Sequence, residues 1–314
     1  MWIRGIDSVE EGDVLALGFF DGVHRGHQYL LGEAYRLAQE RKRRLQILTF
    51  YPHPQNFLST GRDIKHIVTY REKYFLIQKL FPQSLVCFVH FNKSFREKKA
   101  YEFLALIEEK VKPQVVVVGE NFRFGFEAQG DAELLKNYFS SRGTEVIVVP
   151  TLQEGGDPIS SSRIRWHLEN GDLLSVNHLL GYSFFLQGRV RRGRGMGRKL
   201  GFPTANFYPP SYKLLPLSGV YAGSVSGKEI GNHNLSLIYV GNRPTVNFSP
   251  RRLVEVFIPG VCREFYGERL TIEFQAFLRE EMVFSSLEEL KNQIGRDLEA
   301  LYISAARCKS SFYV

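Results

Sequence analysis

The chain has 314 residues, of which 44% are hydrophobic and 24% charged, and its formal net charge at pH 7 is +8. This length and composition predict a globular protein with a sizeable core in two domains, and the positive charge suits either nucleic acid or substrates that carry several phosphates. No apolar run is long enough to cross a bilayer, the N-terminus lacks a signal-peptide core, and the three scattered cysteines fit neither a disulfide framework nor a zinc site.

Short β-rich runs alternate with helical runs up to about Gly181. Strands are expected within residues 13–19, 44–50, 84–91, 114–119 and 144–150. Helices are expected at residues 29–39, with Leu30, Ala34 and Leu37 on one face, and at residues 99–111, with Phe103, Leu106 and Ile107 on one face. This alternation predicts an α/β domain with a doubly wound parallel sheet, which binds ligands at the carboxyl ends of its strands.

The stretch GFFDGVHRGH, residues 18–27, lies between the first expected strand and the first expected helix. Its glycines allow a tight turn, and the helix that follows offers backbone N–H groups to an anion. His24 and His27 are three residues apart on the first helical turn, so both can face that anion. Two histidines without a carboxylate or thiolate cluster make a poor metal site. A turn with incidental histidines is the alternative, and the histidine pair among glycines argues against it.

Two further stretches are candidates for phosphate binding. DPISSSRIRWHL, residues 157–168, places three serines before a helical run, and Arg163 and Arg165 can grip phosphate oxygens in a fork. Asn121 and Arg123 follow the expected strand at residues 114–119, with a phenylalanine beside each. Taken alone, the serines could be only a helix cap and the second stretch only core aromatics with a surface arginine.

After Gly181 the pattern changes to successive strands with glycine-rich turns. Strands are expected within residues 182–193, 219–225, 235–241, 252–261 and 268–278, followed by a helix at residues 286–302 with Leu287, Leu290 and Ile294 on one face. Serial strands of this kind predict a small antiparallel β-barrel, followed here by a C-terminal helix. The expected domains are therefore residues 1–181 and 182–314.

The stretch RVRRGRGMGRKLGFPTANF, residues 189–207, is basic and rich in glycine. It could be a solvated loop, a nucleic-acid-binding arm or a flexible flap that closes over phosphates. Thr204 and Asn206 add oxygen atoms of the kind that Mg²⁺ prefers. The stretch is not a P-loop, because the spacing GxxxxGK[ST] is absent from it.

These motifs resemble a known family. GFFDGVHRGH, TFYPHP, GENFRFG and ISSSRIR resemble, in this order, the adenylyltransferase half of bacterial bifunctional riboflavin kinase/FAD synthetases. GRKLGFPTAN, GVYAG, VGNRPTVN and the run from LVEVFI to about Asp297 look like the riboflavin kinase module. The first motif alone marks only the wider nucleotidyltransferase superfamily, whereas the set covers nearly the whole chain. The resemblance implies phosphorylation of riboflavin to FMN by ATP, then adenylylation of FMN to FAD with release of pyrophosphate.

The resemblance also implies roles for individual residues. His24 and His27 would contact the phosphates of ATP, Glu255 would be the base of the kinase, and the Mg²⁺ ligands would be Thr204 and Asn206. The nucleotide- and phosphate-binding residues would be Gly18, Phe20, Asp21, Gly22, Asn121, Ser161, Ser162, Arg165, Gly197, Lys199, Gly201 and Pro203. Flavin contacts would come from Phe122, Phe124 and Arg279.

The chemistry of the two reactions agrees with a base in the kinase half and none in the adenylyltransferase half. The phosphate of FMN is mostly ionised at neutral pH, so adenylyl transfer needs alignment and charge screening but no base. The 5′-hydroxyl of riboflavin is a neutral alcohol, so the kinase needs a group that takes its proton. Alternation in VEVFI would by itself make Glu255 an ordinary outward-facing strand residue, whereas the resemblance makes it that base.

Several positions depart from the family pattern. Tyr51 stands where an acidic residue is more usual, and Ser162 stands where threonine is commoner. In the kinase module, Phe257 replaces a usual histidine, Pro259–Gly260 replace a polar or acidic position, and Met282–Val283 stand where a lysine is common. These changes lie near the flavin side, so they bear on the rate and flavin fit of the kinase more than on its nucleotide site.

Other functions remain as alternatives. A chain with an impaired kinase would adenylylate FMN but not phosphorylate riboflavin. A flavin- or nucleic-acid-binding regulator would use the basic stretch Arg189–Lys199, although PTAN and the HxGH pair argue against this function. A nucleotidyltransferase that acts on another phosphate is a further alternative, and the second half of the chain argues against it. The expected substrates are ATP, riboflavin and FMN, with Mg²⁺ as cofactor. We expect a cytoplasmic location and no membrane or nucleic-acid partner, with self-association left open.

Overall fold

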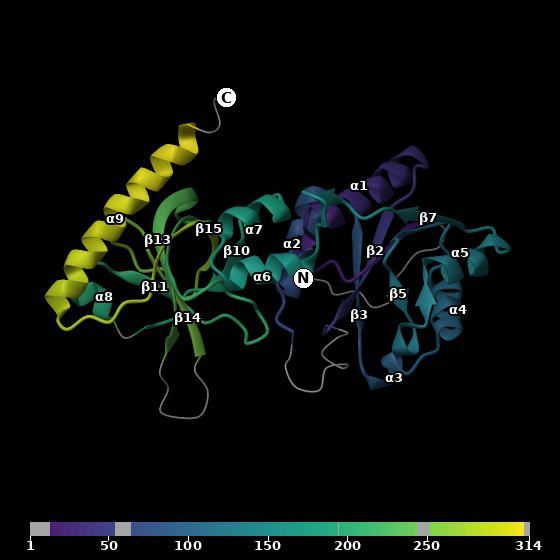
Figure 1. Ribbon diagram of the computed structural model, residues 1–314, viewed down its shortest axis with the longest axis horizontal. Helices are drawn as coiled ribbons and strands as arrows, with labels where there is room; N and C mark the ends of the chain where they lie inside the picture. The colour runs from purple at the N-terminus through teal and green to yellow at the C-terminus, as the bar shows by residue number, and fades with distance from the viewer. Residues whose placement is uncertain (1–12, 54–63, 194, 244–250, 311–314) are drawn as a thin grey trace. The chain divides into compact units, whose positions relative to one another are not determined.

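The computed structural model describes residues 13–53, 64–193, 195–243 and 251–310 (Figure 1). They form two compact units, one up to Ser161 and the other from Ser162. This division falls earlier than Gly181, because the two helices α6 (Ser161–Glu169) and α7 (Leu173–Leu180) group with the second unit. The domain boundary at Gly181 stays a prediction. No helix in the described ranges is both long and apolar enough to cross a membrane.

The first unit is built on a five-stranded parallel sheet. Its strands are β1 (Val14–Leu17), β2 (Leu45–Tyr51), β3 (Leu85–His90), β4 (Val115–Gly119) and β7 (Glu145–Val149), in the order β3-β2-β1-β4-β7. These are the five strands that the apolar runs predict, and the doubly wound parallel sheet is confirmed. The strand order reverses between β1 and β4, so the loops after these two strands open where α/β sheets bind ligands.

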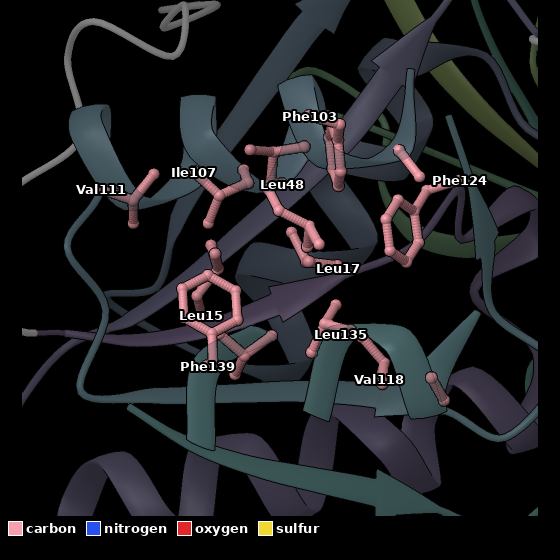
Figure 2. Close-up of a cluster of buried hydrophobic side chains, with 14 of the residues drawn as sticks. Leu15, Leu17, Leu48, Phe103, Ile107, Val111, Val118, Phe124, Leu135 and Phe139 are labelled. Atoms are coloured by element: carbon pink, nitrogen blue, oxygen red, sulfur yellow. The ribbon is translucent and has the colours of Figure 1, made fainter. Parts of the chain in front are cut away.

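Helices cover both faces of this sheet. On one face, Phe103 of α4 (Ala100–Lys110) and Phe139 of α5 (Ala132–Ser140) belong to one buried cluster with Leu15 and Leu17 of β1 (Figure 2). On the other face, α1 (Arg25–Glu40) packs against β1, β2 and β4 and buries the apolar stripe that its spacing predicts. In α4, Leu106 is only half-buried, and Leu104 takes the fully buried position instead.

Shorter elements complete the first unit. The sequence analysis predicted neither α5 nor α2 (Tyr70–Leu80), which packs against the loop after β1. The remaining elements are η2 (Asp21–Val23), α3 (Lys93–Arg96), β5 (Arg123–Phe124), η4 (Phe126–Ala128), β6 (Gly130–Asp131), β8 (Gln153–Glu154) and β9 (Asp157–Pro158).

The second unit is built on a six-stranded antiparallel sheet. Its strands are β10 (Phe185–Arg189), β11 (Thr204–Phe207), β12 (Gly219–Gly227), β13 (Gly231–Arg243), β14 (Arg251–Phe257) and β15 (Arg269–Glu280), in the order β10-β15-β12-β13-β14-β11. A bridge between Arg191 and Asn206 brings the two edges together, so the sheet curls toward a barrel as the sequence predicts. The sequence analysis missed β11, which contains the PTAN residues.

Side chains alternate between the two faces of this curled sheet. The inner face carries Phe207, Tyr221 and Phe274, all almost fully buried, and Phe207 reaches across to Gly188 on the opposite edge. The outer face is covered by the long helix α9 (Leu287–Ser310), which packs on β12, β13 and β15 (Figure 1). The outer face is therefore partly enclosed rather than exposed to solvent. A short helix, α8 (Met196–Lys199), precedes β11.

Candidate active sites

The loop after β1 turns sharply through a left-handed backbone. Phe20, Gly22 and Val23 have positive φ angles of 52°, 78° and 40°. Two of these residues are not glycine, so the loop holds a backbone conformation that costs free energy unless its surroundings fix it. Gly18 is needed because a Cβ there would lie 2.6 Å from the ring of Phe20.

Hydrogen bonds from several elements hold this loop in place. Ser161 Oγ, at the start of α6, donates to the carbonyl oxygen of Asp21 at 2.9 Å. The carboxylate of Asp21 accepts hydrogen bonds from the backbone N–H groups of Ile67 and Val68, at 3.1 and 3.3 Å. Gln28 Nε2 donates to the carbonyl oxygen of the loop's Val23 at 2.8 Å. The loop is therefore shaped before any ligand binds.

His24 and His27 meet at the start of α1. Their rings stack with centroids 3.6 Å apart and planes inclined by 19°. His24 Nδ1 accepts a hydrogen bond from the backbone N–H of His27 at 3.3 Å, which leaves Nε2 to carry the proton of the neutral ring. Burial, and then the nearby His24 and Lys73, lower the pKa of His27 well below its ordinary value. His27 Nδ1 is enclosed and has no hydrogen-bond partner among the described residues.

The second phosphate-binding candidate begins at α6. Ser161 lies against the loop, as described above, and it is the first residue of the helix. Ser162 and Arg165 are three residues apart on the same helix, so they share a face. The sequence predicts all three serines before the helix, whereas Ser161 and Ser162 form its first turn and only Ser160 precedes it.

The residues after β4 have different surroundings. Asn121 is exposed beyond the end of β4, and its Nδ2 donates to Thr151 Oγ1 at 2.9 Å. Phe122 and Phe124 stack at 5.6 Å between centroids, and Phe124 is buried in the core that Figure 2 shows. Phe124 therefore serves the packing of the first unit, and the flavin contact proposed for this pair stays a prediction.

In the second unit, β11 and β14 bring three predicted residues together. Asn206 pairs with Glu255 across the antiparallel strands, so both side chains, and that of Thr204, lie on the outer face. Thr204 Oγ1 donates to Glu255 Oε2 at 3.5 Å, and Asn206 Nδ2 donates to the carbonyl oxygen of Thr204 at 3.2 Å. The predicted base and the two predicted metal ligands are 49 or more residues apart in sequence but adjacent in the sheet.

A cavity of about 450 Å³ lies between this outer face and α9. Its polar lining includes Thr204, Asn206 and Glu255, and Leu290 and Ile294 of α9 line it from the helix side. The position where the family has histidine is part of its apolar wall, because Phe257 packs edge-on against Phe202 at 5.4 Å. Met282, a second departure from the family pattern, also lines it.

A second cavity, also of about 450 Å³, reaches the same threonine. Its lining includes Pro203 and Thr204 of the PTAN stretch and two arginines, Arg198 and Arg263. The exposed thiol of Cys262 is also part of the lining. Both arginines are paired with carboxylates, Arg198 with Glu264 and Arg263 with Glu268. Thr204 thus lines a largely apolar cavity and a second, more polar one, an arrangement that suits two substrates meeting at one hydroxyl.

Two features of the first cavity were missed by the sequence analysis. Arg279, predicted to contact flavin, forms a bidentate ion pair with the buried Asp297 of α9, at 2.8 Å for both contacts. Tyr239 Oη donates to Glu281 Oε1 at 2.5 Å, and burial raises the pKa of this phenol. Both pairs link segments far apart in the chain, so spacing in the sequence carries no signal for them.

The glycine-rich stretch before β11 is shaped by close contacts. A Cβ on Gly197 would lie 2.3 Å from the carbonyl oxygen of Phe202, and Gly201 has a φ of 87°. Lys199 belongs to α8, but its side chain lies outside the described part of the structure, as do Arg194 and the residues of VGNRPTVN beyond Arg243. The TFYPHP motif is described as far as His53, whose ring lies 3.9 Å from that of Phe19.

Comparisons with known proteins match both halves. Residues 6–163 match the family model of FAD synthetase, and residues 180–303 match that of riboflavin kinase. The bifunctional riboflavin kinase/FMN adenylyltransferase of Escherichia coli (strain K12) is 35% identical over 301 residues, covering 94% of this chain and 95% of that protein. The Bacillus subtilis (strain 168) protein of the same name is 33% identical over 289 residues, covering 90% of each. A crystal structure described as a macrolide-efflux protein from Streptococcus pneumoniae aligns with a TM-score of 0.83 at 27% identity, over 96% of this chain and 97% of that one.

The matched families follow the order of the two sites. The histidine loop after β1 lies within the FAD synthetase match, and the Glu255 cavity lies within the riboflavin kinase match. The curated relatives carry both modules in one chain of similar length. The chain belongs to the bifunctional riboflavin kinase/FMN adenylyltransferase family.

Proposed function

We propose that this chain makes FAD from riboflavin in two steps, one at each of the sites described above. The kinase module phosphorylates riboflavin with ATP, and the FAD synthetase module joins the FMN so formed to AMP from a second ATP. One observation carries the assignment of residues. Glu255 faces Thr204 at 3.5 Å in a cavity with an apolar wall, where a carboxylate suits an alcohol nucleophile on an aromatic substrate.

In the kinase step, the 5′-oxygen of riboflavin attacks the γ-phosphorus of ATP. The bond from that phosphorus to the ADP oxygen breaks, and the hydroxyl proton passes to Glu255. The direction of Glu255 is set by its strand, which is paired on both sides with β11 and β13. Flavin in the apolar cavity and nucleotide in the second, more polar cavity would meet at Thr204, which lines both.

Mg²⁺ would be held by Thr204 Oγ1 and Asn206 Oδ1. Both are neutral oxygens on one face of β11, and Asn206 Nδ2 is used in a hydrogen bond to the backbone, which leaves Oδ1 for a cation. This small donor set fits Mg²⁺, which takes many of its ligands from water and substrate phosphates. Bound there, the ion would neutralise negative charge on the phosphoryl group.

In the adenylyl step, a phosphate oxygen of FMN attacks the α-phosphorus of ATP and pyrophosphate leaves. The attacking oxygen is already ionised, so the site has to align the two phosphates and stabilise their charge. His24 and His27, whose rings stack at the start of α1, are proposed to contact these phosphates. Further phosphate contacts are proposed from Asn121 and from the serines and arginine of α6.

A chain active only in the adenylyl step is the second candidate. Phe257 favours it, because this ring fills part of the flavin cavity at a position where the family pattern has histidine. The nucleotide-binding features of the kinase, Thr204 and Asn206, are nevertheless in place beside Glu255. We therefore keep the bifunctional enzyme as the conclusion.

A time course by chromatography separates these functions. The purified chain is incubated with excess ATP and Mg²⁺ and with either riboflavin or FMN. FMN that rises and then gives way to FAD supports both steps. FAD from FMN alone indicates that the kinase is impaired, and no conversion by a folded chain in either tube overturns the proposal.

We also expect the chain to act in the cytoplasm on small molecules alone. Cys87 and Cys262 are free thiols, which fits a reducing compartment. The basic stretch before β11 is the part of the chain that would bind nucleic acid, so RNA binding tests this expectation. RNA retained by the chain at low salt and released at high salt would contradict this expectation.

A further inference from the structure

A buried lysine lies beneath the loop that carries the two histidines, and neither of the steps above uses it. Lys73 belongs to α2, and its side chain is 2% exposed. Lysine is almost never fully buried unless it is paired, because removing an ammonium group from water is costly. The partners of Lys73 therefore show what its burial achieves.

The ammonium group of Lys73 binds the residue that enters the loop. Its Nζ donates to the carbonyl oxygen of Phe19 at 2.5 Å and to Thr49 Oγ1 at 3.2 Å. The hydroxyl of Thr49 donates to the same carbonyl oxygen at 2.7 Å. The ammonium also lies 4.1 Å from the centroid of the Phe19 ring, within cation–π range. Phe19 is thus held both by its backbone and by its side chain.

Holding Phe19 matters because the strained part of the loop begins at the next residue. Phe20 and Val23 are left-handed, and such residues persist only where neighbouring groups determine their conformation. The ring of Phe20 packs edge-on against that of His27, with centroids 5.4 Å apart. A rotation of the peptide after Phe19 would therefore move the ring that packs on His27.

The charge of Lys73 also acts on this site. Burial lowers the pKa of Lys73 to about 8, against the opposing effect of the Asp21 carboxylate. Lys73 in turn helps to lower the pKa of His27, which stacks on His24. His53 and His66 pack around the ring of Phe19 at 3.9 and 5.7 Å. These groups are the titratable neighbours from the loop, α1 and the segments that flank Phe19.

We propose that Lys73 is a positioning residue of the FMN adenylyltransferase site, which fixes the carbonyl of Phe19 so that the loop presents His24 and His27, and whose protonated form adds a positive charge beside this loop. A charge that is already in place stabilises a transition state without reorganisation. The inference rests on the proposed function of this site.

Three variants of the full chain test it. K73M removes the charge and the donors but keeps an unbranched side chain, whereas K73R keeps the charge and the donors. K79M is the matched control, because Lys79 is exposed on the same helix. For each variant, kcat and KM of adenylyl transfer to FMN are measured across pH, together with riboflavin phosphorylation and the melting temperature.

K73M is expected to lower kcat/KM of adenylyl transfer about 100-fold, mostly through kcat, because the lost charge and alignment act in the transition state. K79M and the riboflavin kinase reaction of K73M should stay within about twofold of wild type. In the wild type the adenylyl rate should fall as pH rises through about 8, when Lys73 loses its proton. K73R should move that fall to higher pH, since guanidinium stays charged. A purely structural role would change the melting temperature and leave the pH profile in place.

Two results would overturn the inference. One is a K73M enzyme whose kcat/KM stays within about threefold of wild type. The other is a K73R enzyme that loses activity at the same pH as wild type, and this comparison decides the matter even if K73M does not fold. A wild-type chain that forms no FAD from FMN would instead overturn the proposed function itself. The two failures are therefore distinguishable.

Discussion

Among single residues, the proposed function assigns a carboxylate, Glu255, to the kinase step and a pair of imidazoles to the adenylyl step. Replacing Glu255 by glutamine keeps its shape and removes the proton acceptor. We expect kcat of riboflavin phosphorylation to fall by about 10²- to 10⁴-fold, the usual contribution of a general base. The exposed Glu280 provides the control, because E280Q removes a nearby carboxylate outside the cavity. A kinase that keeps its kcat in E255Q, measured by FMN formation, would show that another group takes the proton.

Because Lys73 is buried, the free energy of unfolding should depend on pH, and the direction of that dependence can be predicted. Burial lowers its pKa from 10.5 to about 8, so between these pH values the folded state has lost a proton that the unfolded state keeps. Unfolding then takes up a proton, and the free energy of unfolding contributed by Lys73 rises with pH, by at most about 1.4 kcal/mol per pH unit. Below pH 8 this contribution is flat.

Urea unfolding of wild type and K73M at several pH values checks this prediction. The wild type should gain stability relative to K73M as pH rises above about 8. The adenylyl rate is expected to fall over the same interval, so that loss of activity could not be attributed to unfolding. A constant difference in stability between the two proteins across this range would contradict the burial of a charged lysine.

Sequence reasoning reached some of these residues and not others for physical reasons. Alternation in VEVFI places Glu255 on the outer face of its strand, and the structure agrees. That this face is covered by α9 depends on tertiary packing, which a strand pattern does not encode. Lys73 carried no signal, because a lysine in a helix is normally solvated and its buried partners are a backbone carbonyl and a threonine.

At the scale of elements, the stretch between β10 and β11 depends on glycines that allow close contacts. A Cβ on Gly197 would lie 2.3 Å from the carbonyl oxygen of Phe202 and 3.3 Å from Thr204 Oγ1. G197A should therefore displace the segment that leads to Thr204. We expect riboflavin phosphorylation to fall at least about tenfold, because displacements of about 1 Å at reacting groups are costly.

The control for this variant lies in α9. Gly295 has open space where a Cβ would be added, so G295A should keep both activities and stabilise the helix by about 0.5–1 kcal/mol. Adenylyl transfer should be normal in both variants. Equal kinase rates in G197A and G295A would show that the glycine-rich stretch tolerates displacement.

The elements themselves were predicted unevenly. The strands β1, β2, β3 and β4 are mainly apolar and mostly buried, as their sequences predict. The edge strand β7 is also mainly apolar, but most of it is only partly buried or exposed. The sequence predicts metal ligands at Thr204 and Asn206 but no strand there, because these polar residues interrupt any apolar run. The helix α2 was missed because its buried face includes Glu72 and Lys73 among the apolar residues.

At the scale of the whole molecule, the two activities rest on different compact units. The histidine loop belongs to the first unit and the Glu255 cavity to the second. Each family model likewise matches a separate range, residues 6–163 and 180–303. Glu255 and the two histidines, which we assign to the two steps, can therefore be replaced independently.

This separation predicts complementation between two inactive chains. E255Q should convert FMN but not riboflavin to FAD, whereas H27A should convert riboflavin only as far as FMN. Because Glu255 and His27 lie in different compact units, FMN made by H27A is expected to be released, to diffuse and to be adenylylated by E255Q. A mixture of the two variants with riboflavin and ATP should then form FAD after a lag, which chromatography would detect. Accumulation of FMN without FAD in the mixture, with both single activities intact, would instead mean that FMN must pass between sites without leaving the chain that made it.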